Sequence, residues 1–348
     1  RPIPSGRRRA AARTRSRPSL VNRGTAIAVA GGLGLAVMIG FGPRIGIDLG
    51  SPFVPAQIPP EELDALPAHL ERSESALSLV ATTEKKITWH EGPARTDLAV
   101  VAIHGFSASR MESAPLAQDV AHRLRANLFE TRLRGHGRSD DVLHNATATQ
   151  WLEDCSEALL IGSRLGDRVV VLGVSTGATL AALAAPLRLA GHENVDANVL
   201  ISPNFGVRDP SARVLEWPWM RQILPLFMPR RSFEPHNEDQ GRFWTTDYGI
   251  AAVFEMQSLV NATRSVDWSQ SSVPALTLVS PDDDVVDVKA TERVLSSWPP
   301  SLKRLRKIQV PPGRSTHVIA GQILNPELTV VLTDAIVSFV TERRAHED

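Results

Sequence analysis

The sequence of 348 residues contains a single cysteine, Cys155. One thiol can form no intrachain disulfide and cannot build a thiolate-rich metal site, which excludes both as supports of the fold. Cys155 lies in an expected helix without a basic neighbour that would activate it, so we interpret it as a small core residue. With 43% hydrophobic residues, the chain has ample apolar material for a core instead.

The chain also lacks net charge, with 38 basic against 38 acidic residues, but the balance is uneven along the sequence. Residues 1–23 contain eight arginines and no acidic residue, which leaves residues 24–348 with 30 Lys and Arg against 38 Asp and Glu. Nucleic-acid binding relies on a surplus of Lys and Arg, so the acidic body argues against nucleic acid as its partner. The basic tail, residues 1–23, needs a separate explanation.

Residues 24–42 contain no charged residue, and as a helix rising about 1.5 Å per residue they nearly span a hydrocarbon core of roughly 30 Å. The positive-inside bias keeps the preceding arginines in the cytoplasm and places the rest of the chain across the membrane. We therefore expect a single-pass membrane anchor with a cytoplasmic N-terminus and an extracytoplasmic catalytic domain. Two alternatives stay open: a cleaved signal segment, which would make the protein secreted, and a buried glycine-rich helix.

Residues 43–77 separate this segment from the main body. Five prolines between residues 43 and 60 disfavour a helix or a central strand and indicate a linker. Apolar Leu63, Leu66 and Leu70 recur at helical spacing and predict one short amphipathic helix over residues 61–75.

In residues 78–348, short apolar runs alternate with helical patterns, which predicts an α/β fold with a mostly parallel central sheet flanked by helices. The expected strands are residues 98–103, 126–131, 168–173, 197–202, 275–280 and 307–310. The expected helices are residues 114–125, 147–165, 176–189 and 328–340. Between about residues 203 and 270 the alternation breaks down into apolar and aromatic pieces, which indicates an insertion.

The motif GVSTG, residues 173–177, places Ser175 directly after an expected strand and before an alanine-rich helix. A Gly-x-Ser-x-Gly motif at such a turn is typical of a serine nucleophile, held in strained backbone geometry above the sheet. The flanking glycines remove Cβ atoms that would collide with the strand and the helix. An ordinary serine that caps a helix is the alternative interpretation.

A serine hydroxyl needs a base to take its proton, and a histidine held by a carboxylate fills that role. His317 follows the last expected strand, and Asp283 follows residues 275–280, so the order Ser, Asp, His is present. Loops at the carboxyl edge of a parallel sheet converge, which brings distant residues together. The neighbouring Asp282 and Asp284 stay open as alternative acids.

A tetrahedral intermediate needs backbone donors, and the amide of Phe106, in a loop after residues 98–103, is one candidate. Its expected partner is the amide of Thr176. His104 is interpreted as a residue that shapes this loop, because His317 already serves as base. A lone His136 between two glycines favours a turn over a metal site, so we expect no metal.

The segments HGFSAS (104–109), TRLRGHGRSDD (131–141), GVSTG (173–177) and PDDDVVD (281–287), with the late His317, resemble the α/β-hydrolase superfamily over residues 78–343. Within it, the chain is similar to the bacterial carboxylesterase and monoacylglycerol-lipase-like branch, which carries the serine aminopeptidase S33-type domain. The resemblance implies an α/β-hydrolase fold, a helical lid corresponding to about residues 203–270, no cofactor, and Asp283 as the catalytic acid.

The leading hypothesis is a serine hydrolase that cleaves carboxylic esters through an acyl-enzyme. The aromatic insertion suggests a small-molecule ester with an apolar acyl chain. A peptide or amide hydrolase is the first alternative, and Glu234 and Glu238 could then hold a substrate amine. A catalytically silent, membrane-anchored binding protein is the second, against which the intact Ser175, Asp283 and His317 argue.

Overall fold

The structure is a computed structural model that describes residues 40–55 and 57–347. Contacts divide the chain into Arg1–Pro43 and Arg44–Asp348, and the second unit contains the sheet and its helices. The basic tail and, apart from residues 40–42, the expected membrane anchor lie outside the described residues. Within the described part, no helix combines the length and the hydropathy that a membrane span requires.

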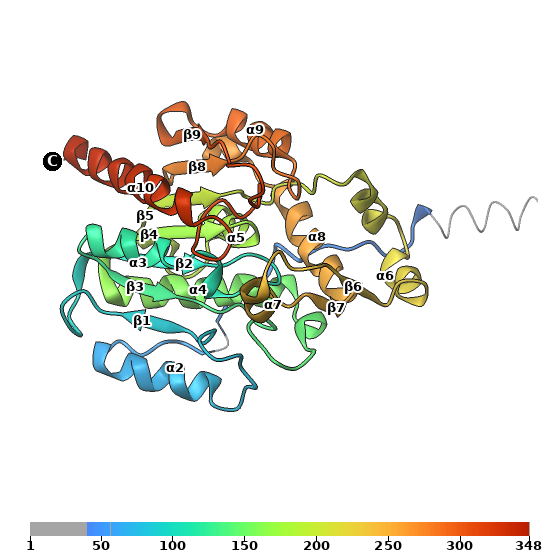
Figure 1. The fold of residues 1–348 in the computed structure, drawn as a ribbon, viewed down its shortest axis with the longest axis horizontal. Helices are drawn as coiled ribbons and strands as arrows, with labels where there is room; N and C mark the ends of the chain where they lie inside the picture. The colour runs from blue at the N-terminus through green and yellow to red at the C-terminus, as the bar shows by residue number, and fades with distance from the viewer. Residues whose placement is uncertain (1–39, 56, 348) are drawn as a thin grey trace, which may run out of the picture. The chain divides into compact units, whose positions relative to one another are not determined.

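Seven strands of the described residues form one sheet in the order β1-β3-β2-β4-β5-β8-β9 (Figure 1). Every neighbouring pair is parallel except β1 and β3, so the expectation of a mostly parallel sheet is confirmed. The strands are β1 Lys86–Thr88, β2 Thr96–Ile103, β3 Asn127–Glu130, β4 Gly166–Val174, β5 Val195–Ile201, β8 Ala275–Val279 and β9 Lys303–Lys307.

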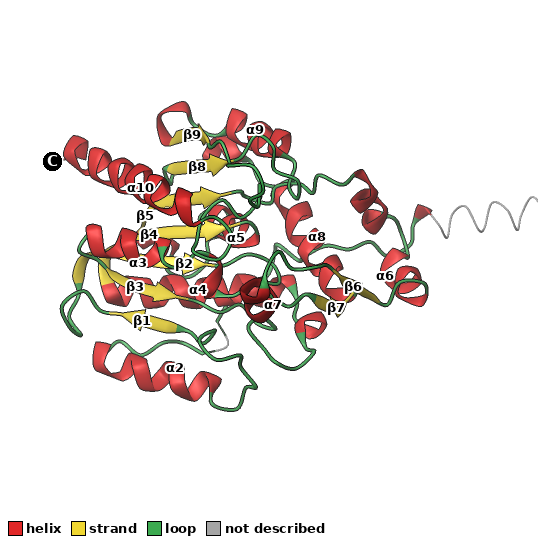
Figure 2. Cartoon of the chain, in the orientation of Figure 1, coloured by secondary structure: helices red, strands yellow, loops and turns green. Residues whose placement is uncertain are grey.

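Helices cover both faces of this sheet (Figure 2). The helices are α2 Leu66–Glu74, α3 Leu116–Arg123, α4 Ala148–Leu165, α5 Thr176–Ala184, α6 Met220–Ile223, α7 Glu238–Phe243, α8 Ala251–Thr263, α9 Val288–Ser297 and α10 Pro326–Glu347. The start of α4 is fixed by a capping box, in which the Thr147 side chain accepts from the Gln150 amide while the Gln150 side chain accepts from the Thr147 amide.

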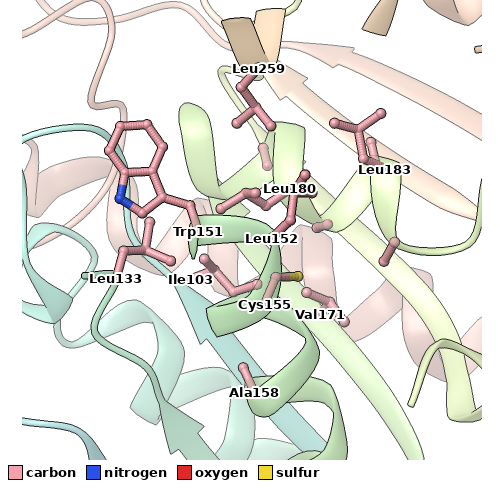
Figure 3. Packing of buried hydrophobic residues seen from close by; sticks show 14 of the residues in the cluster. Ile103, Leu133, Trp151, Leu152, Cys155, Ala158, Val171, Leu180, Leu183 and Leu259 are labelled. Atoms are coloured by element: carbon pink, nitrogen blue, oxygen red, sulfur yellow. The ribbon is translucent and has the colours of Figure 1, made fainter. Parts of the chain in front are cut away.

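The strands are apolar on both faces because each face packs against helices. Alternate residues of β2 point to opposite sides: Val101 and Ile103 pack with α4 and α5, whereas Val100 and Ala102 pack with α3 and α10. Figure 3 shows the first of these clusters, in which Trp151, Leu152 and Cys155 of α4 contact the sheet and α5.

One expected strand is misplaced and several elements were not foreseen. The strand expected at residues 307–310 is β9 at Lys303–Lys307, whose sequence KRLRK lacks an apolar run because it forms an exposed edge of the sheet. The short edge strand β1 and the amphipathic helix α9 were also missed.

Residues 202–274, between β5 and β8, form the insertion. It contains the 3₁₀ turns η5 Pro210–Glu216 and η6 Leu224–Leu226, the helices α6, α7 and α8, and the antiparallel strands β6 Arg230–Ser232 and β7 Asp247–Gly249. The expected helical insertion therefore also carries a small two-stranded sheet. It lies on the side toward which the arrowheads of the parallel strands point (Figure 2).

Residues 44–60, expected as a linker, contain no helix or strand among their described members, yet they pack on the body. Phe53 is buried in the main core, and its carbonyl accepts a hydrogen bond from the Ser156 hydroxyl of α4. Ile45, Ile47 and Leu49 pack against the same core. This segment is therefore part of the folded unit.

Candidate active site

Ser175 occupies a tight turn between β4 and α5. Its backbone has φ 52° and ψ −113°, a conformation that L-residues rarely adopt, and its amide donates to the Ile201 carbonyl at 2.8 Å. A Cβ at Gly173 would lie 2.5 Å from the Ala178 amide nitrogen, and one at Gly177 would overlap the Ile103 carbonyl oxygen. The glycines therefore permit the close approach of strand and helix that the sequence predicts.

His317 lies between Ser175 and Asp283. Its Nε2 is 2.9 Å from the Ser175 Oγ, and its Nδ1 is 2.9 Å from one Asp283 oxygen and 3.2 Å from the other. All three side chains are buried. Asp283 and His317 lie 108 and 142 positions after Ser175 in the sequence. The fold thus brings the three side chains together in a continuous series of hydrogen bonds from hydroxyl to carboxylate.

The neighbouring aspartates are placed differently from Asp283. Asp282 and Asp284 are exposed, and Asp284 accepts a hydrogen bond from the Thr316 hydroxyl at 2.8 Å. Asp283 instead accepts from the amides of Val285 and Val286, both at 2.9 Å, which fixes its carboxylate toward His317. Among these three carboxylates, only Asp283 contacts the histidine within the described residues.

Two polar side chains that sequence reasoning missed hold the His317 loop. The Ser202 hydroxyl donates to the His317 carbonyl at 2.7 Å. The Asn325 side-chain amide donates to the carbonyls of Ser315 and Val318 at 2.8 and 2.6 Å. Neither residue belongs to a sequence pattern, so only their positions in space connect them with the site.

Of the two amides expected to act as donors, one directly follows Ser175 in the chain, and the other belongs to a residue that lines the same cavity. Thr176 is the first residue of α5, where a helix leaves its amide without an intrahelical partner. Phe106 lines the same cavity as Ser175, and neither its amide nor that of Thr176 has a hydrogen-bond partner among the described residues. The Phe106 ring packs edge-on against Tyr248 and Trp151, with centroids 5.2 and 5.9 Å apart, which restrains this loop.

Glu112 is a buried acid at the site that sequence reasoning missed. Its Oε2 accepts from the Gly105 amide at 2.6 Å, and it lines the cavity together with Ser175 and His317. Burial raises the pKa of Glu112 to about 7, although the Gly105 amide and the nearby His317 act in the opposite direction. A single glutamate in a short 3₁₀ turn has no pattern that would reveal it.

The charges and hydrogen bonds around His317 also shift its pKa. Burial alone would lower the pKa of His317, but the hydrogen bond and charge of Asp283, with the charges of Glu112 and Asp284, outweigh it. The pKa of His317 is therefore raised above 6.5. A raised pKa means that the surroundings stabilise the protonated, cationic form of His317. This is the form that the ring takes after it accepts a proton.

His104 and His136 serve the loops around the site. The Nδ1 of His104 is 2.8 Å from the Gly105 carbonyl oxygen, and its Nε2 accepts from the Leu133 amide at 3.1 Å, so both nitrogens bind backbone. Burial lowers the pKa of His104 to about 4 and that of His136 well below its ordinary value. Both rings are therefore neutral near pH 7, in line with the expected loop-shaping role of His104.

The single cysteine and the possibility of a metal site are considered last. Cys155 is buried between α4 and the sheet, and burial raises the pKa of its thiol to about 12, in agreement with a core residue. Within the described part of the chain, no three His, Cys, Asp or Glu side chains are grouped closely enough to hold a metal ion.

Ser175 and His317 open into a cavity of about 640 Å³. Most of its wall comes from the insertion, and much of that wall is apolar: Leu215, Leu224, Met228, Phe233, Trp244 and Val253. Of the two lid acids singled out from the sequence, Glu234 lines the cavity, whereas Glu238 is not part of its wall. A cavity of this size and lining suits a small, largely apolar ligand.

A parallel sheet, a serine at a strained strand-to-helix turn and a hydrogen-bonded histidine define an α/β-hydrolase. The family model described as "Serine aminopeptidase, S33" matches residues 94–309, more than half of the chain, and the protein belongs to that family. The resemblance read from the motifs is confirmed. No curated protein matches the sequence.

Several solved structures share the fold. One, reported with the metagenome-derived lipolytic enzymes LipS and LipT, has a TM-score of 0.62 and 18% identity over 76% of this chain and 99% of its own. The monoacylglycerol lipase of Paleococcus ferrophilus has a TM-score of 0.55 and 15% identity over 74% and 98%. A monoglyceride lipase variant from Saccharomyces cerevisiae has a TM-score of 0.54 and 12% identity over 74% and 90%.

Proposed function

We propose that the protein is a serine hydrolase that cleaves carboxylic esters of small molecules with an apolar acyl chain. The observation that carries this proposal is the continuous chain of hydrogen bonds from Ser175 through His317 to Asp283 beside a largely apolar cavity. The lipolytic enzymes among the similar structures make an ester the first substrate to test.

In this mechanism, the Ser175 hydroxyl transfers its proton to the His317 Nε2 as the oxygen attacks the ester carbonyl. The Phe106 and Thr176 amides donate hydrogen bonds to the resulting oxyanion. The intermediate collapses to an acyl-Ser175, and His317 returns the proton to the departing alcohol. Water then attacks the acyl group with His317 as base, which releases the acid and restores the serine. Asp283 holds the imidazole and stabilises its cationic form.

The insertion acts as a lid in this proposal. It supplies most of the cavity wall, so it excludes water from the acyl chain and sets the chain length that fits. The mechanism needs no cofactor, because His317 accepts and returns every proton that is transferred, and the two amides stabilise the oxyanion.

We further propose that residues 24–42 anchor the protein in a membrane, with residues 1–23 in the cytoplasm and the catalytic domain on the other side. The uncharged stretch and the eight preceding arginines support this arrangement. The test is extraction of membranes with alkaline carbonate, which should leave the full chain in the pellet. Release into the supernatant, or loss of residues 1–42 from the mature protein, would contradict an uncleaved anchor.

The function is tested with p-nitrophenyl esters of two to sixteen acyl carbons, measured on the purified chain and on Ser175→Ala. We expect turnover that peaks at one chain length and falls roughly 10⁴- to 10⁶-fold in the variant, because the nucleophile is lost. Labelling by a fluorophosphonate should also depend on Ser175. Near-normal turnover by Ser175→Ala would sink the assignment, and absent labelling of folded protein would favour a silent binding protein.

A second candidate is hydrolysis of an amide whose substrate carries a free amine. The specific observation is that Glu112 and Glu234 both line the cavity, where carboxylates could bind an ammonium group. Aminoacyl p-nitroanilides distinguish the two: turnover of these, with labelled Ser175 and no turnover of esters, would replace the ester proposal.

A further inference from the structure

A second cavity, of about 400 Å³, lies between the insertion and α9, and we call it the α9 cavity. It shares Val207, Asp209 and Ala212 with the cavity that contains Ser175, so the two are neighbours, but Ser175 lines only the other one. We propose that the α9 cavity binds a small carboxylate with an apolar body and that its occupancy acts on the loop of Asp283. The binding stands on its own, whereas an effect on turnover rests on the proposed function.

The buried part of the wall is apolar. Phe205 and Trp268 are buried, and their ring centroids lie 5.6 Å apart. Trp268 also stacks on Trp298, with centroids 5.3 Å apart, so its ring is held from both sides. The partly buried Val266 and Val294 line the cavity beside them. A packed apolar wall around this volume suits the body of a small ligand.

The remaining wall carries charged side chains. Two acids in it are neutralised by arginines that line the same cavity. Glu216 pairs with Arg264, with a nitrogen–oxygen distance of 2.9 Å. Asp287 pairs with Arg293, with a nitrogen–oxygen distance of 3.1 Å. The charges that remain therefore decide which ligand the cavity favours.

Two arginines remain, and one acid opposes them. Arg208 and Arg213 line the cavity together with Asp209. Arg213 is exposed and makes no ion pair within the described part of the chain. A concave site concentrates the field of such a surplus, and a guanidinium donates two parallel hydrogen bonds to a carboxylate. One surplus positive charge beside an apolar wall favours a monoanion with an apolar body over an inorganic phosphate.

The wall is hydrogen-bonded to the loop that carries the catalytic acid. The Arg208 guanidinium donates to the Asp283 carbonyl, and the Arg208 amide donates to the Val285 carbonyl at 3.0 Å. Two residues later, the Asp287 amide donates to the Gly206 carbonyl at 2.7 Å. A ligand between the insertion and α9 therefore contacts residues that are bonded to this loop. We expect it to restrain the loop and so to hold Asp283 in place.

The binding test uses the full chain and a benzoate that carries a photoreactive diazirine. Mass spectrometry of the digested protein then identifies the labelled residues. The label should fall on residues 205–216, 263–268 and 287–294, which contain the wall of the α9 cavity. Unlabelled benzoate should compete with it. Benzyl alcohol, which lacks the charge, and inorganic phosphate, which lacks the apolar body, should not.

Arg213→Gln should reduce the labelling of the α9 cavity at least fivefold, because it removes the surplus charge. Arg306→Gln is the matched control, since Arg306 is exposed on β9 and also lacks an ion pair within the described residues; it should change nothing. Three results would each overturn the site: label found only on peptides around Ser175, competition by benzyl alcohol or phosphate as strong as that by benzoate, or undiminished labelling of Arg213→Gln.

A second measurement tests the effect on Asp283. A benzoate concentration that abolishes the labelling should raise kcat for p-nitrophenyl acetate at least twofold in the parent, and should not raise it in Arg213→Gln. A higher KM with unchanged kcat would mean that benzoate acts on turnover only from the Ser175 cavity, which overturns this effect. If no protein hydrolyses any ester, the proposed function fails while the labelling still decides the binding.

Discussion

His317 is surrounded by two acids that act on it in different ways. Asp283 binds its Nδ1 directly, while Glu112 acts through charge from across the cavity wall. The first fixes the tautomer that presents a free Nε2 to Ser175, and the second adds to the stabilisation of the imidazolium. The two acids can therefore be separated by substitutions that keep their shape.

Asp283→Asn should lower kcat roughly 10⁴-fold, because an amide can present its NH₂ group to Nδ1 and select the wrong tautomer. His317 acts as base only when neutral, so the parent gains activity as pH rises through its raised pKa, above 6.5. Asp283 is the main group that raises the pKa of His317, and the variant lacks its charge. The pH at which the activity of the variant rises should therefore be lower than in the parent. The measurement is the pH profile of kcat/KM on one ester; a limb that stays in place contradicts the assignment of Asp283.

Glu112→Gln should change how stability depends on pH. Burial raises the pKa of Glu112 to about 7 from 4.5, so the folded chain binds this proton more tightly than the unfolded chain. This proton therefore contributes to the free energy of unfolding, and its contribution is complete below pH 4.5. The contribution is lost as pH rises through about 7, which lowers the free energy of unfolding by about 3 kcal/mol in all. Glutamine keeps an acceptor for the Gly105 amide and does not titrate.

The measurement is urea unfolding of both proteins from pH 4.5 to 8. The stability of the parent relative to Glu112→Gln should fall across this range, since every other titrating group is common to the two proteins. Parallel stability curves would mean that Glu112 is already ionised throughout.

At the scale of single residues, those that belong to a motif or to a recognisable order along the chain could be predicted from the sequence. Ser175, Asp283 and His317 follow strands in a recognisable order, and the structure brings them together. Glu112, Ser202 and Asn325 could not be predicted, because each acts through a neighbour that only the folded chain supplies. The roles of the Phe106 and Thr176 amides remain a prediction.

At the scale of elements, α5 approaches the end of β2 more closely than any side chain at residue 177 allows. A Cβ there would overlap the Ile103 carbonyl oxygen and lie 2.6 Å from that of His104. Gly177→Ala should therefore lower the free energy of unfolding by about 3 kcal/mol and displace the serine turn.

Gly241→Ala in α7 is the matched control. Its nearest contact would be a Pro235 side-chain atom at 3.4 Å, which is an ordinary van der Waals distance. Alanine is the better helix former, so this variant should be neutral or slightly more stable. Thermal unfolding of the two variants measures the difference; equal melting temperatures would show that α5 can shift away from β2.

The buried strands were predictable because both of their faces are apolar. β2 and β4 alternate between two cores, so their sequences are continuous apolar runs. β9 is exposed and charged, and β1, β6 and β7 have three residues each, so none carries a hydrophobic period that a sequence can display. These strands form because a neighbouring strand or the insertion supplies their hydrogen bonds.

At the scale of the whole molecule, the folded unit extends back to Arg44. The proline pattern of residues 43–60 correctly excluded helices and strands from the described part, but it could not reveal that Phe53 enters the core. Packing of an irregular segment has no period, so its anchoring residues are visible only in the structure.

Phe53→Ala should lower the free energy of unfolding by about 3 kcal/mol, because it empties a site against α4. The adjacent Val54→Ala, at a position that is 55% exposed, should change it by less than about 0.5 kcal/mol. Chemical denaturation of both variants provides the comparison. Equal, small effects would mean that residues 44–60 behave as a tether after all.

The cavity wall and the reacting groups come from different parts of the chain. Ser175, Asp283 and His317 follow strands of the sheet, whereas most of the wall belongs to the insertion. Point mutations in the wall can therefore alter ligand preference while the sheet and the residues around Ser175 stay intact. During evolution, a lineage with this layout can exchange one substrate for another in single steps without passing through an unfolded or inactive ancestor.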